Sequence, residues 1–429
     1  MRYTPAPAEL YIHNRKKLFE KLLPNSIVII DSNDVMPTNA DGTMGFKQYS
    51  DLLFLSGIDQ EETLLVLYPD AKDSSQREIL FVRETNEKIA IWEGAKLNKE
   101  QAKEISGINT IQWVHEFDSI LKGLMADADN VYVSTNEHTR RSGQVEIRNL
   151  RLIHKLQEQY PVHQYRRLAP IISRLRSIKH PHEITLIKKA CEITGKGFRR
   201  LLSFVKQGVT EYEIEAELMH EFLRNRSRGF AYGPIIASGA GSCVLHYIEN
   251  NKTCQAGDIL LLDVAAEYAN YASDLTRCIP VSGTYTTRQK AVYNAVLRVH
   301  KQAVQMLKPG NTIKQVNEDV GLLVEKELVD LGLITTEDIR NQNPAWPAYK
   351  KYFMHGTSHF LGLDVHDVGY FNEPIQPGMI FTCEPGIYIR EENLGIRIEN
   401  DILVSDNEPI DLMHDIPIEA DEIEELMNA

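Results

Sequence analysis

Five potential metal ligands are spaced through the C-terminal part of the chain, namely Asp263, Asp274, His359, Glu384 and Glu399. The four carboxylates fall into two pairs, and each pair flanks a predicted β-hairpin. Four carboxylates that are brought together repel one another strongly unless a cation lies between them. Two divalent ions about 3.5–4 Å apart would suit such a cluster and could generate a hydroxide nucleophile at neutral pH. The spacing therefore indicates a dinuclear, metal-dependent hydrolase.

The first predicted hairpin is formed by GDILLLDVAAEY and YASDLTRCIPV, which are joined by a short turn. Asp263 and Asp274 are symmetric about the point between Tyr268 and Ala269. Residues directly opposite each other in an antiparallel pair have Cβ atoms about 4.5–5.5 Å apart and point to the same side. We therefore expect Asp263 and Asp274 to face each other.

The second hairpin repeats this arrangement. FTCEPGIYI and LGIRIENDILV flank the polar turn of residues 390–393, and Glu384 and Glu399 are symmetric about that turn. Acidic residues on hairpins are often solvated surface groups. The sequence before Glu384 is apolar, however, as is the run of residues 259–262 before Asp263, and such runs are typical of buried strands. A carboxylate at the end of a buried strand is costly unless it is paired or binds metal.

Histidines strengthen the prediction of a metal site. The segment HGTSHFLGLDVHD contains His355, His359 and His366. The first two have the spacing of a helical zinc pair, but two glycines in the segment disfavour a helix, and a loop that runs into a strand is expected instead. His246, in SCVLHY, is an isolated fourth candidate, for which the alternative is an ordinary packed or surface histidine.

These motifs resemble a known family. HGTSHFLGLDVHDVG, EPGIYI, GIRIEND and YASDLTR are similar to segments of the metallopeptidases that include aminopeptidase P, prolidase and methionine aminopeptidase. The resemblance covers about residues 177–429 and implies the pita-bread (creatinase/aminopeptidase-type) fold for this part. FKQYSDLLFLSG and IWEGAK extend the resemblance to the N-terminal half, where they are similar to segments of aminopeptidase P.

The resemblance also implies roles for the ligands. Asp274 and Glu399 would bridge both metal ions, Asp263 would bind one ion, and His359 and Glu384 would bind the other. Glu384 also matches the family's proton shuttle, which takes a proton from the attacking water and passes it to the leaving nitrogen. One imidazole among four carboxylates favours Mn²⁺, with Co²⁺, Fe²⁺ and Zn²⁺ as alternatives.

The remaining site residues would act on the substrate or on the ligands. His246, His355 and His366 match the family's three non-ligand histidines, which would bind substrate and stabilise the oxyanion, a role worth about 10²–10³-fold in rate per donor. Arg397 lies two residues before Glu399 and shares its face of a strand, so we expect it to support the carboxylates as an ion pair. The alternative is an exposed surface arginine.

Trp92 matches a tryptophan that helps to close the substrate pocket across a subunit contact in the bacterial relatives. This match predicts a homo-oligomer, either a dimer or a tetramer. The alternative for Trp92 is ordinary packing of an amphipathic helix.

Three functions compete at this point. The first is an aminopeptidase that removes the residue before a proline at the second position of oligopeptides. The second is a prolidase, which is confined to Xaa-Pro dipeptides; chain length and the FKQYSDLLFLSG segment favour the aminopeptidase. The third is a metal-free binding or scaffold module on the same fold, which the full set of ligands disfavours.

Composition limits the partners and the location. A net charge of −13 argues against nucleic acid and anionic membranes as partners. No apolar run approaches the roughly 20 residues of a membrane span, and the first residues form no hydrophobic signal segment. The five scattered cysteines fit a reducing compartment, so a cytoplasmic location is expected. Cys383 could be a nucleophile, but a packed core thiol is the preferred interpretation.

With 429 residues, the chain is long enough for two or three domains. We expect an N-terminal α/β domain (residues 1–175) and a pita-bread catalytic domain (residues 176–429). The order of predicted elements supports this division. Strands are predicted at residues 26–31, 63–69, 78–83 and 131–134, and helices near residue 120 and over 136–160, 181–206 and from 211 onward.

Overall fold

The computed structural model describes residues 3–140 and 145–429, and these residues divide into two compact units. One unit is Pro5–Arg176 and the other contains Ser177–Ala429. Thr4 belongs to the second unit, where its backbone N–H donates to the Tyr268 hydroxyl over 3.2 Å. The division falls close to the boundary expected near residue 175.

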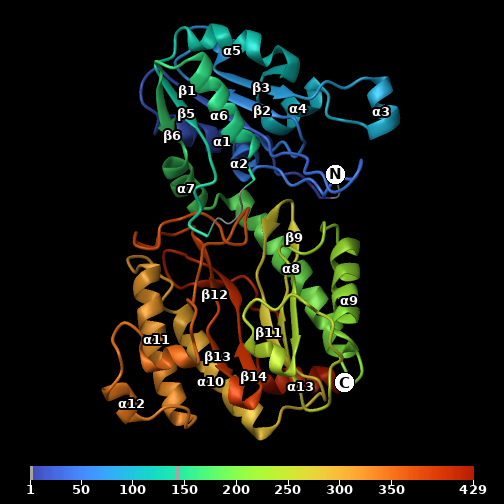
Figure 1. The fold of residues 1–429 in the computed structure, drawn as a ribbon, viewed down its shortest axis with the longest axis vertical. Coiled ribbons are helices and arrows are strands. Elements are labelled where there is room, and N and C mark those ends of the chain that lie inside the picture. The colour runs from blue at the N-terminus through green and yellow to red at the C-terminus, as the bar shows by residue number, and fades with distance from the viewer. Residues whose placement is uncertain (1–2, 141–144) are drawn as a thin grey trace. The chain divides into compact units, whose positions relative to one another are not determined.

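The N-terminal unit is built on a six-stranded mixed sheet in the order β4-β3-β2-β1-β5-β6 (Figure 1). β2 pairs antiparallel with both β1 and β3, and the other neighbours are parallel. Every residue of β1 is buried, which explains its continuous apolar sequence. The strands are β1 (Ser26–Asp31), β2 (Leu64–Leu67), β3 (Glu78–Val82), β4 (Thr110–Trp113), β5 (Asn130–Val133) and β6 (Gln164–Arg167).

Helices surround this sheet, and the α/β class expected for this unit is confirmed. A core cluster joins side chains of β1, β2 and β3 to α5 and α6. The helices are α1 (Ala8–Phe19), α2 (Ser50–Ser56), α3 (Glu87–Glu93), α4 (Lys99–Ser106), α5 (Phe117–Met125), α6 (Arg148–Gln159) and α7 (Ala169–Ser177), with short 3₁₀ turns η1 (Ser74–Gln76) and η2 (Val114–Glu116).

Two sequence predictions for this unit are corrected. The helix expected over residues 136–160 is confined to α6, and the described residues between 136 and 147 are not helical; residues 141–144 lie outside the described part of the chain. β4 and β6 were not predicted, because their residues are mostly half-exposed or exposed and lack an apolar run.

The second unit packs several small antiparallel sheets between helices. In Figure 1, α8 and α9 lie on one side of these strands and α10 and α11 on the other. The strands are β7 (Ile235–Ser238), β8 (Ile259–Asp263), β9 (Glu267–Tyr268), β10 (Tyr271–Ala272), β11 (Thr276–Pro280), β12 (Ile380–Cys383), β13 (Gly386–Ile389), β14 (Leu394–Arg397), β15 (Asn400–Leu403) and β16 (Ile410–Asp411).

The helices of this unit begin where capping signals predict. Pro181 occupies the first turn of α8, and the backbone N–H of Thr210 donates to the Glu213 side chain in the capping box that opens α9. α8 ends at Phe204, two residues before the predicted end. The helices are α8 (Pro181–Phe204), α9 (Glu211–Arg224), α10 (Thr287–Val304), α11 (Ile313–Asp330), α12 (Thr336–Arg340) and α13 (Ala420–Met427), with 3₁₀ turns η3 (Gly239–Cys243), η4 (Ala348–Lys351) and η5 (Arg390–Glu392).

The register predicted for the first acidic hairpin is wrong by two residues. Asp263 is paired with Thr276 rather than with Asp274. Tyr268 pairs with Tyr271, so the turn is only two residues long, and Ala269 and Asn270 both have positive φ (53° and 69°), as in a type I′ turn. A shift of two residues preserves the side-chain face, so both aspartates still belong to the same side of the hairpin.

The register predicted for the second hairpin is confirmed. Ile389 pairs with Leu394 next to the turn, and Cys383 pairs with Asn400 on the far side of the interruption between the strands. Both ladders follow one register, which places Glu384 opposite Glu399. None of the helices in the described residues combines the length and the apolarity that a membrane span requires.

Candidate active site

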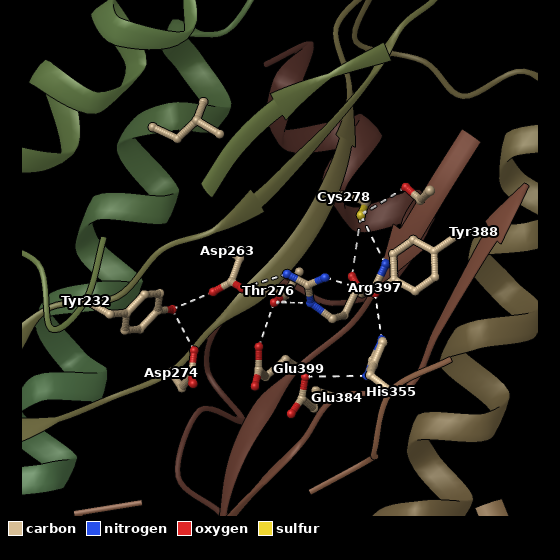
Figure 2. A network of polar contacts seen from close by, with 12 residues as sticks. Tyr232, Asp263, Asp274, Thr276, Cys278, His355, Glu384, Tyr388, Arg397 and Glu399 are labelled. Carbon is tan, nitrogen blue, oxygen red and sulfur yellow. Dashed lines mark hydrogen bonds and ion pairs between the residues drawn. The ribbon is translucent and has the colours of Figure 1, made fainter. Parts of the chain in front are cut away.

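The predicted ligands meet where the two acidic hairpins converge. Ligand atoms of Asp274, His359 and Glu399 all lie within 4.8 Å of one another, and all three residues are buried. The His359 Nε2 atom is 3.5 Å from Asp274 Oδ2 and 3.7 Å from Glu384 Oε1. Asp263 joins this group through the Tyr232 hydroxyl, which lies 2.7 Å from Asp263 Oδ1 and 2.6 Å from Asp274 Oδ1 (Figure 2).

Each carboxylate lies at a strand end or in a gap between strands. Asp263 is the last residue of β8, and Asp274 follows β10. Glu384 lies between β12 and β13, and Glu399 between β14 and β15. The Glu399 backbone N–H donates to the Thr276 carbonyl over 3.1 Å and so links the two hairpins. The ligands are therefore held by backbone hydrogen bonds of the surrounding sheets.

His359 is oriented by its own backbone. Its Nδ1 atom lies 3.0 Å from the Phe360 carbonyl oxygen, which can only accept a hydrogen bond. Nδ1 therefore carries the proton, and Nε2 faces the carboxylates as a ligand atom. Burial lowers the pKa of His359, but Asp274 and Glu384 outweigh burial and raise it to about 9. The segment around His359 is irregular, with one isolated bridge from Phe360 to Phe381, so the strand expected there does not form.

Burial makes this group of carboxylates costly to ionise together. It raises the pKa of Glu384 to about 7 although His359 opposes the shift, and it raises the pKa of Glu399 well above its usual value with Asp274 adding to the effect. The pKa of Asp263 is also raised by burial, although Arg397 opposes the shift. Divalent cations would offset these charges, and four carboxylates with one imidazole are a donor set that suits them.

Arg397 lies among the ligands, so the alternative of a surface arginine is excluded. The residue is 4% exposed. Its Nη2 atom forms an ion pair with Asp263 Oδ2 at 2.6 Å, and its Nη1 donates to the Tyr388 hydroxyl over 2.9 Å. The expected ion pair is confirmed, and Figure 2 shows the guanidinium between Asp263 and Tyr388.

Thr276 connects this arginine to a second ligand. Its hydroxyl donates to Glu399 Oε2 over 2.6 Å and accepts from Arg397 Nε over 3.0 Å. The residue is fully buried, so no water competes for these bonds. Sequence reasoning missed Thr276, Tyr232 and Tyr388. Thr276 could have been found from the correct hairpin register, because it is the residue paired with Asp263.

His355 belongs to the same network. Its Nδ1 lies 2.7 Å from the Gly356 carbonyl oxygen and its Nε2 lies 2.8 Å from the Tyr388 hydroxyl. Burial and the nearby Arg397 lower its pKa to about 3, so the ring is neutral. Since the carbonyl can only accept, the proton is on Nδ1, and Nε2 accepts from Tyr388. The result is a chain of hydrogen bonds from Arg397 through Tyr388 to His355.

The other histidines lie at the exposed edge of the group. His366 is exposed, and its ring packs edge-on against that of His359 with centroids 4.5 Å apart. His246 is also exposed, and it is close enough to His355 to influence the pKa of that residue. Cys383 is buried and burial raises its pKa well above the usual value, so the preferred interpretation of a core thiol is confirmed.

Trp92 lies in the N-terminal unit and is not packed within the chain. It belongs to α3, in which no residue is buried, and is itself 83% exposed. The alternative of ordinary packing on an amphipathic helix is therefore wrong for this chain taken alone. The neighbouring Ile91 is 79% exposed, so the two side chains form an apolar surface.

Comparisons with known proteins show the family of this chain. The sequence model of metallopeptidase family M24 matches residues 185–406, and that of the aminopeptidase P N-terminal domain matches residues 11–132. The chain belongs to metallopeptidase family M24. Among curated M24 relatives, the Xaa-Pro aminopeptidase of Haemophilus influenzae is 32% identical, with 98% of each chain covered. That of Escherichia coli is 32% identical, with 97% of this chain and 96% of the relative covered.

Solved structures of M24 enzymes show the same fold across both units. Pseudomonas aeruginosa aminopeptidase PepP has a TM-score of 0.89 at 30% identity, with 99% of this chain and 98% of that chain covered. Zn-substituted Escherichia coli aminopeptidase P in complex with product has a TM-score of 0.88 at 30% identity, with 99% of each chain covered. The expected combination of an N-terminal α/β domain with a pita-bread catalytic domain is confirmed, and M24 membership supports the binding of divalent metal.

Replacing Thr276 by valine tests whether the hydroxyl that supports Glu399 matters for metal binding. The variant Thr276→Val keeps the shape of the side chain but removes the hydrogen bonds to Glu399 and Arg397. We expect Mn²⁺ affinity to fall about 10- to 100-fold, as is typical when an outer-shell partner is lost. Equilibrium dialysis followed by metal analysis measures this change.

Thr63→Val is the matched control. Thr63 is also fully buried, and its hydroxyl donates to the Gln60 carbonyl over 2.9 Å in the N-terminal unit. Its loss should leave Mn²⁺ affinity at the wild-type value. Wild-type Mn²⁺ affinity in Thr276→Val, as in the control, would show that the Thr276 hydroxyl does not affect metal binding.

Proposed function

We propose that this chain is a dinuclear-metal aminopeptidase that hydrolyses the N-terminal Xaa-Pro bond of oligopeptides. The observation that carries the proposal is that four buried or half-buried carboxylates from two hairpins converge on the buried His359. Relatives named Xaa-Pro aminopeptidase match over nearly the whole chain, and a related solved structure is an Escherichia coli aminopeptidase P in complex with substrate. Nothing comparable favours the prolidase alternative.

The five ligands would hold the metal ions as follows. Asp274 and Glu399 would be shared by two ions, Asp263 would bind one of these ions, and His359 and Glu384 would bind the other. When bound, such ions polarise the scissile carbonyl and lower the pKa of a coordinated water. The oxygen-rich donor set favours Mn²⁺ over Co²⁺, Fe²⁺ and Zn²⁺.

Glu384 is the residue suited to move the proton. The nitrogen of the scissile Xaa–Pro bond is a tertiary amide nitrogen without a hydrogen, and it must gain a proton to leave as the secondary amine of proline. The Glu384 carboxylate faces His359 at 3.7 Å and His355 at 3.9 Å. In this position it would accept a proton from the attacking water and deliver it to the leaving nitrogen.

The three non-ligand histidines divide into two roles. His246 and His366 are exposed beside the cluster, where they would bind the substrate carbonyl and stabilise the oxyanion. His355 was expected to bind substrate as well, but both of its ring nitrogens contact protein groups. We therefore propose that His355 reaches substrate only when its contact with Tyr388 opens, and that Arg397 sets its orientation through Tyr388.

We further propose that the chain forms a homo-oligomer, a dimer or a tetramer, in which Trp92 contacts a second copy. The two exposed apolar side chains of α3 support this proposal, since such patches commonly mark protein contacts. A cytoplasmic location stays a prediction.

The first test is a paired assay of the purified, Mn²⁺-loaded protein on Ala-Pro and Ala-Pro-Ala. We expect cleavage of the Ala–Pro bond in the tripeptide and little cleavage of the dipeptide, because an aminopeptidase also binds residues after proline. Liquid chromatography of the second product, proline from the dipeptide and Pro-Ala from the tripeptide, gives both rates. Faster cleavage of the dipeptide would establish a prolidase. No cleavage of either peptide by the metal-loaded protein would favour the scaffold alternative.

Two substitutions separate a ligand from a substrate-binding residue. Asp274→Asn should lower metal occupancy and abolish hydrolysis, because it removes a bridging anion. His366→Ala should keep its metal but lose about 10²–10³-fold in kcat, the usual cost of one oxyanion donor. Metal analysis and steady-state kinetics on the same preparations decide the outcome. Wild-type activity in Asp274→Asn would contradict the dinuclear assignment, and metal loss in His366→Ala would make that residue a ligand.

The contact assigned to Trp92 is tested by Trp92→Ala. We expect this variant to sediment as a smaller species than the wild type at equal concentration, because the substitution removes most of the apolar surface on α3. Trp346→Ala is the control, since Trp346 is 59% exposed and lies in the catalytic unit. An unchanged sedimentation coefficient in Trp92→Ala would remove this residue from the subunit contact.

A further inference from the structure

A buried ion pair lies beneath the loop that carries the candidate histidines. Lys179 Nζ and Asp367 Oδ2 are 3.0 Å apart, and both side chains are only 1% exposed. Lys179 precedes α8, whereas Asp367 directly follows His366. Burying two charges costs desolvation free energy, and a buried ion pair often stabilises a fold no more than well-packed apolar residues would. Stability alone therefore does not explain why this pair is present.

The loop of residues 360–366 folds back tightly between His359 and Asp367. The Asp367 backbone N–H donates to the Phe360 carbonyl over 2.9 Å, so the two ends of the loop are joined. Within the loop, the Gly362 N–H donates to the Asp364 carbonyl over 3.1 Å. This closure brings the histidines at the two ends together, with ring centroids 4.5 Å apart.

The ion pair fits against this loop with no spare room. A Cβ atom added at Gly362 would lie 2.1 Å from Asp367 Oδ2 and 2.8 Å from Lys179 Nζ. The Gly362 carbonyl accepts a hydrogen bond from the Ala272 N–H over 2.8 Å, and Ala272 lies two residues before Asp274. The pair therefore supports the loop at the point where it meets the strand that leads to a predicted metal ligand.

Lys179 is itself fixed by its surroundings. Its backbone N–H donates to the Gly378 carbonyl over 2.8 Å. Glu183 is a second buried carboxylate near Lys179, and burial raises the pKa of Glu183 although the charge of Lys179 opposes the shift. Glu183 accepts hydrogen bonds from the His180 N–H and the Tyr271 hydroxyl. The Asp367 carboxylate is in direct contact with the Lys179 ammonium.

We propose that Lys179 and Asp367 are positioning residues whose buried ion pair clamps the loop of residues 360–366 and holds His366 against His359. The inference rests on the proposed function, since it concerns how a substrate-binding histidine is placed beside a metal ligand. Loss of the clamp would let His366 move relative to the substrate carbonyl. A displacement of about 1 Å can cost roughly 10²-fold in rate.

Three variants test the clamp, namely Lys179→Met, Asp367→Asn and the double variant. Lys179→Met removes the ammonium that contacts the Asp367 carboxylate, and Asp367→Asn replaces a charged acceptor by a neutral one, so we expect a lower melting temperature for both single variants. In all three we expect kcat on Ala-Pro-Ala to fall about 10- to 100-fold with unchanged metal content. Asp367→Asn is the mildest variant, because its amide oxygen still accepts from Lys179.

The double variant separates positioning from simple stability. It removes both charges, so its melting temperature should recover relative to Lys179→Met. If the pair positions the loop, kcat stays low in the double variant. Recovery of kcat together with the melting temperature would overturn the proposal. Lys301→Met is the control, because the Lys301–Glu419 pair at 2.6 Å is 56% and 52% exposed in the same unit, and its loss should change neither quantity.

Hydrogen exchange gives a second measurement that does not depend on activity. We expect faster exchange of the Gly362 and Asp367 amides in the Lys179→Met and double variants, with unchanged exchange in α10. Unaltered exchange in residues 360–367 would overturn the clamp. A metal-loaded wild-type protein that is silent on Ala-Pro-Ala would overturn the proposed function instead, and exchange would still decide whether the clamp exists.

Discussion

Mutual repulsion among four buried or half-buried carboxylates is the constraint around which the catalytic unit is organised. Asp263, Asp274, Glu384 and Glu399 all lie in low-dielectric surroundings, where each carboxylate raises the cost of ionising its neighbours. The protein supplies two compensating groups, an arginine against Asp263 and a histidine against Asp274 and Glu384. These cations are too few for four anions, and divalent metal ions would supply the remaining charge. The fold must hold these mutually repelling carboxylates close together.

Interrupted antiparallel strands meet this demand. In a continuous strand, the backbone N–H and C=O groups form hydrogen bonds with the neighbouring strand. Glu384 and Glu399 instead lie in the gap between two ladders that share one register. In that gap the Glu399 N–H reaches the Thr276 carbonyl of the other hairpin, and the Glu384 N–H reaches the Thr357 carbonyl beside His359. The backbone thus connects both hairpins and the histidine segment. Backbone hydrogen bonds between these segments therefore place the ligands.

Much of this organisation could be predicted from local sequence, and the exceptions have physical causes. Apolar runs predicted the buried strands. The polar turn of residues 390–393 predicted the register of the second acidic hairpin, because the length of this turn is unambiguous. The first register failed because its centre was taken between Tyr268 and Ala269, whereas the two-residue turn is centred between Ala269 and Asn270. Tyr232 and Tyr388 were missed because no spacing rule links them to the side chains they contact. Such contacts depend on tertiary packing.

The guanidinium of Arg397 shows why the site acts as one unit. One of its nitrogens donates directly to the predicted ligand Asp263. The other two donate to the Thr276 hydroxyl, which contacts Glu399, and to the Tyr388 hydroxyl, which contacts His355. An ammonium group would supply the charge but not this planar set of donors, so lysine is no substitute here. Because one rigid group serves all three contacts, movement of the Asp263 carboxylate changes the orientation of His355 as well. The arrangement of the acidic ligands and the position of a candidate catalytic histidine are therefore set together.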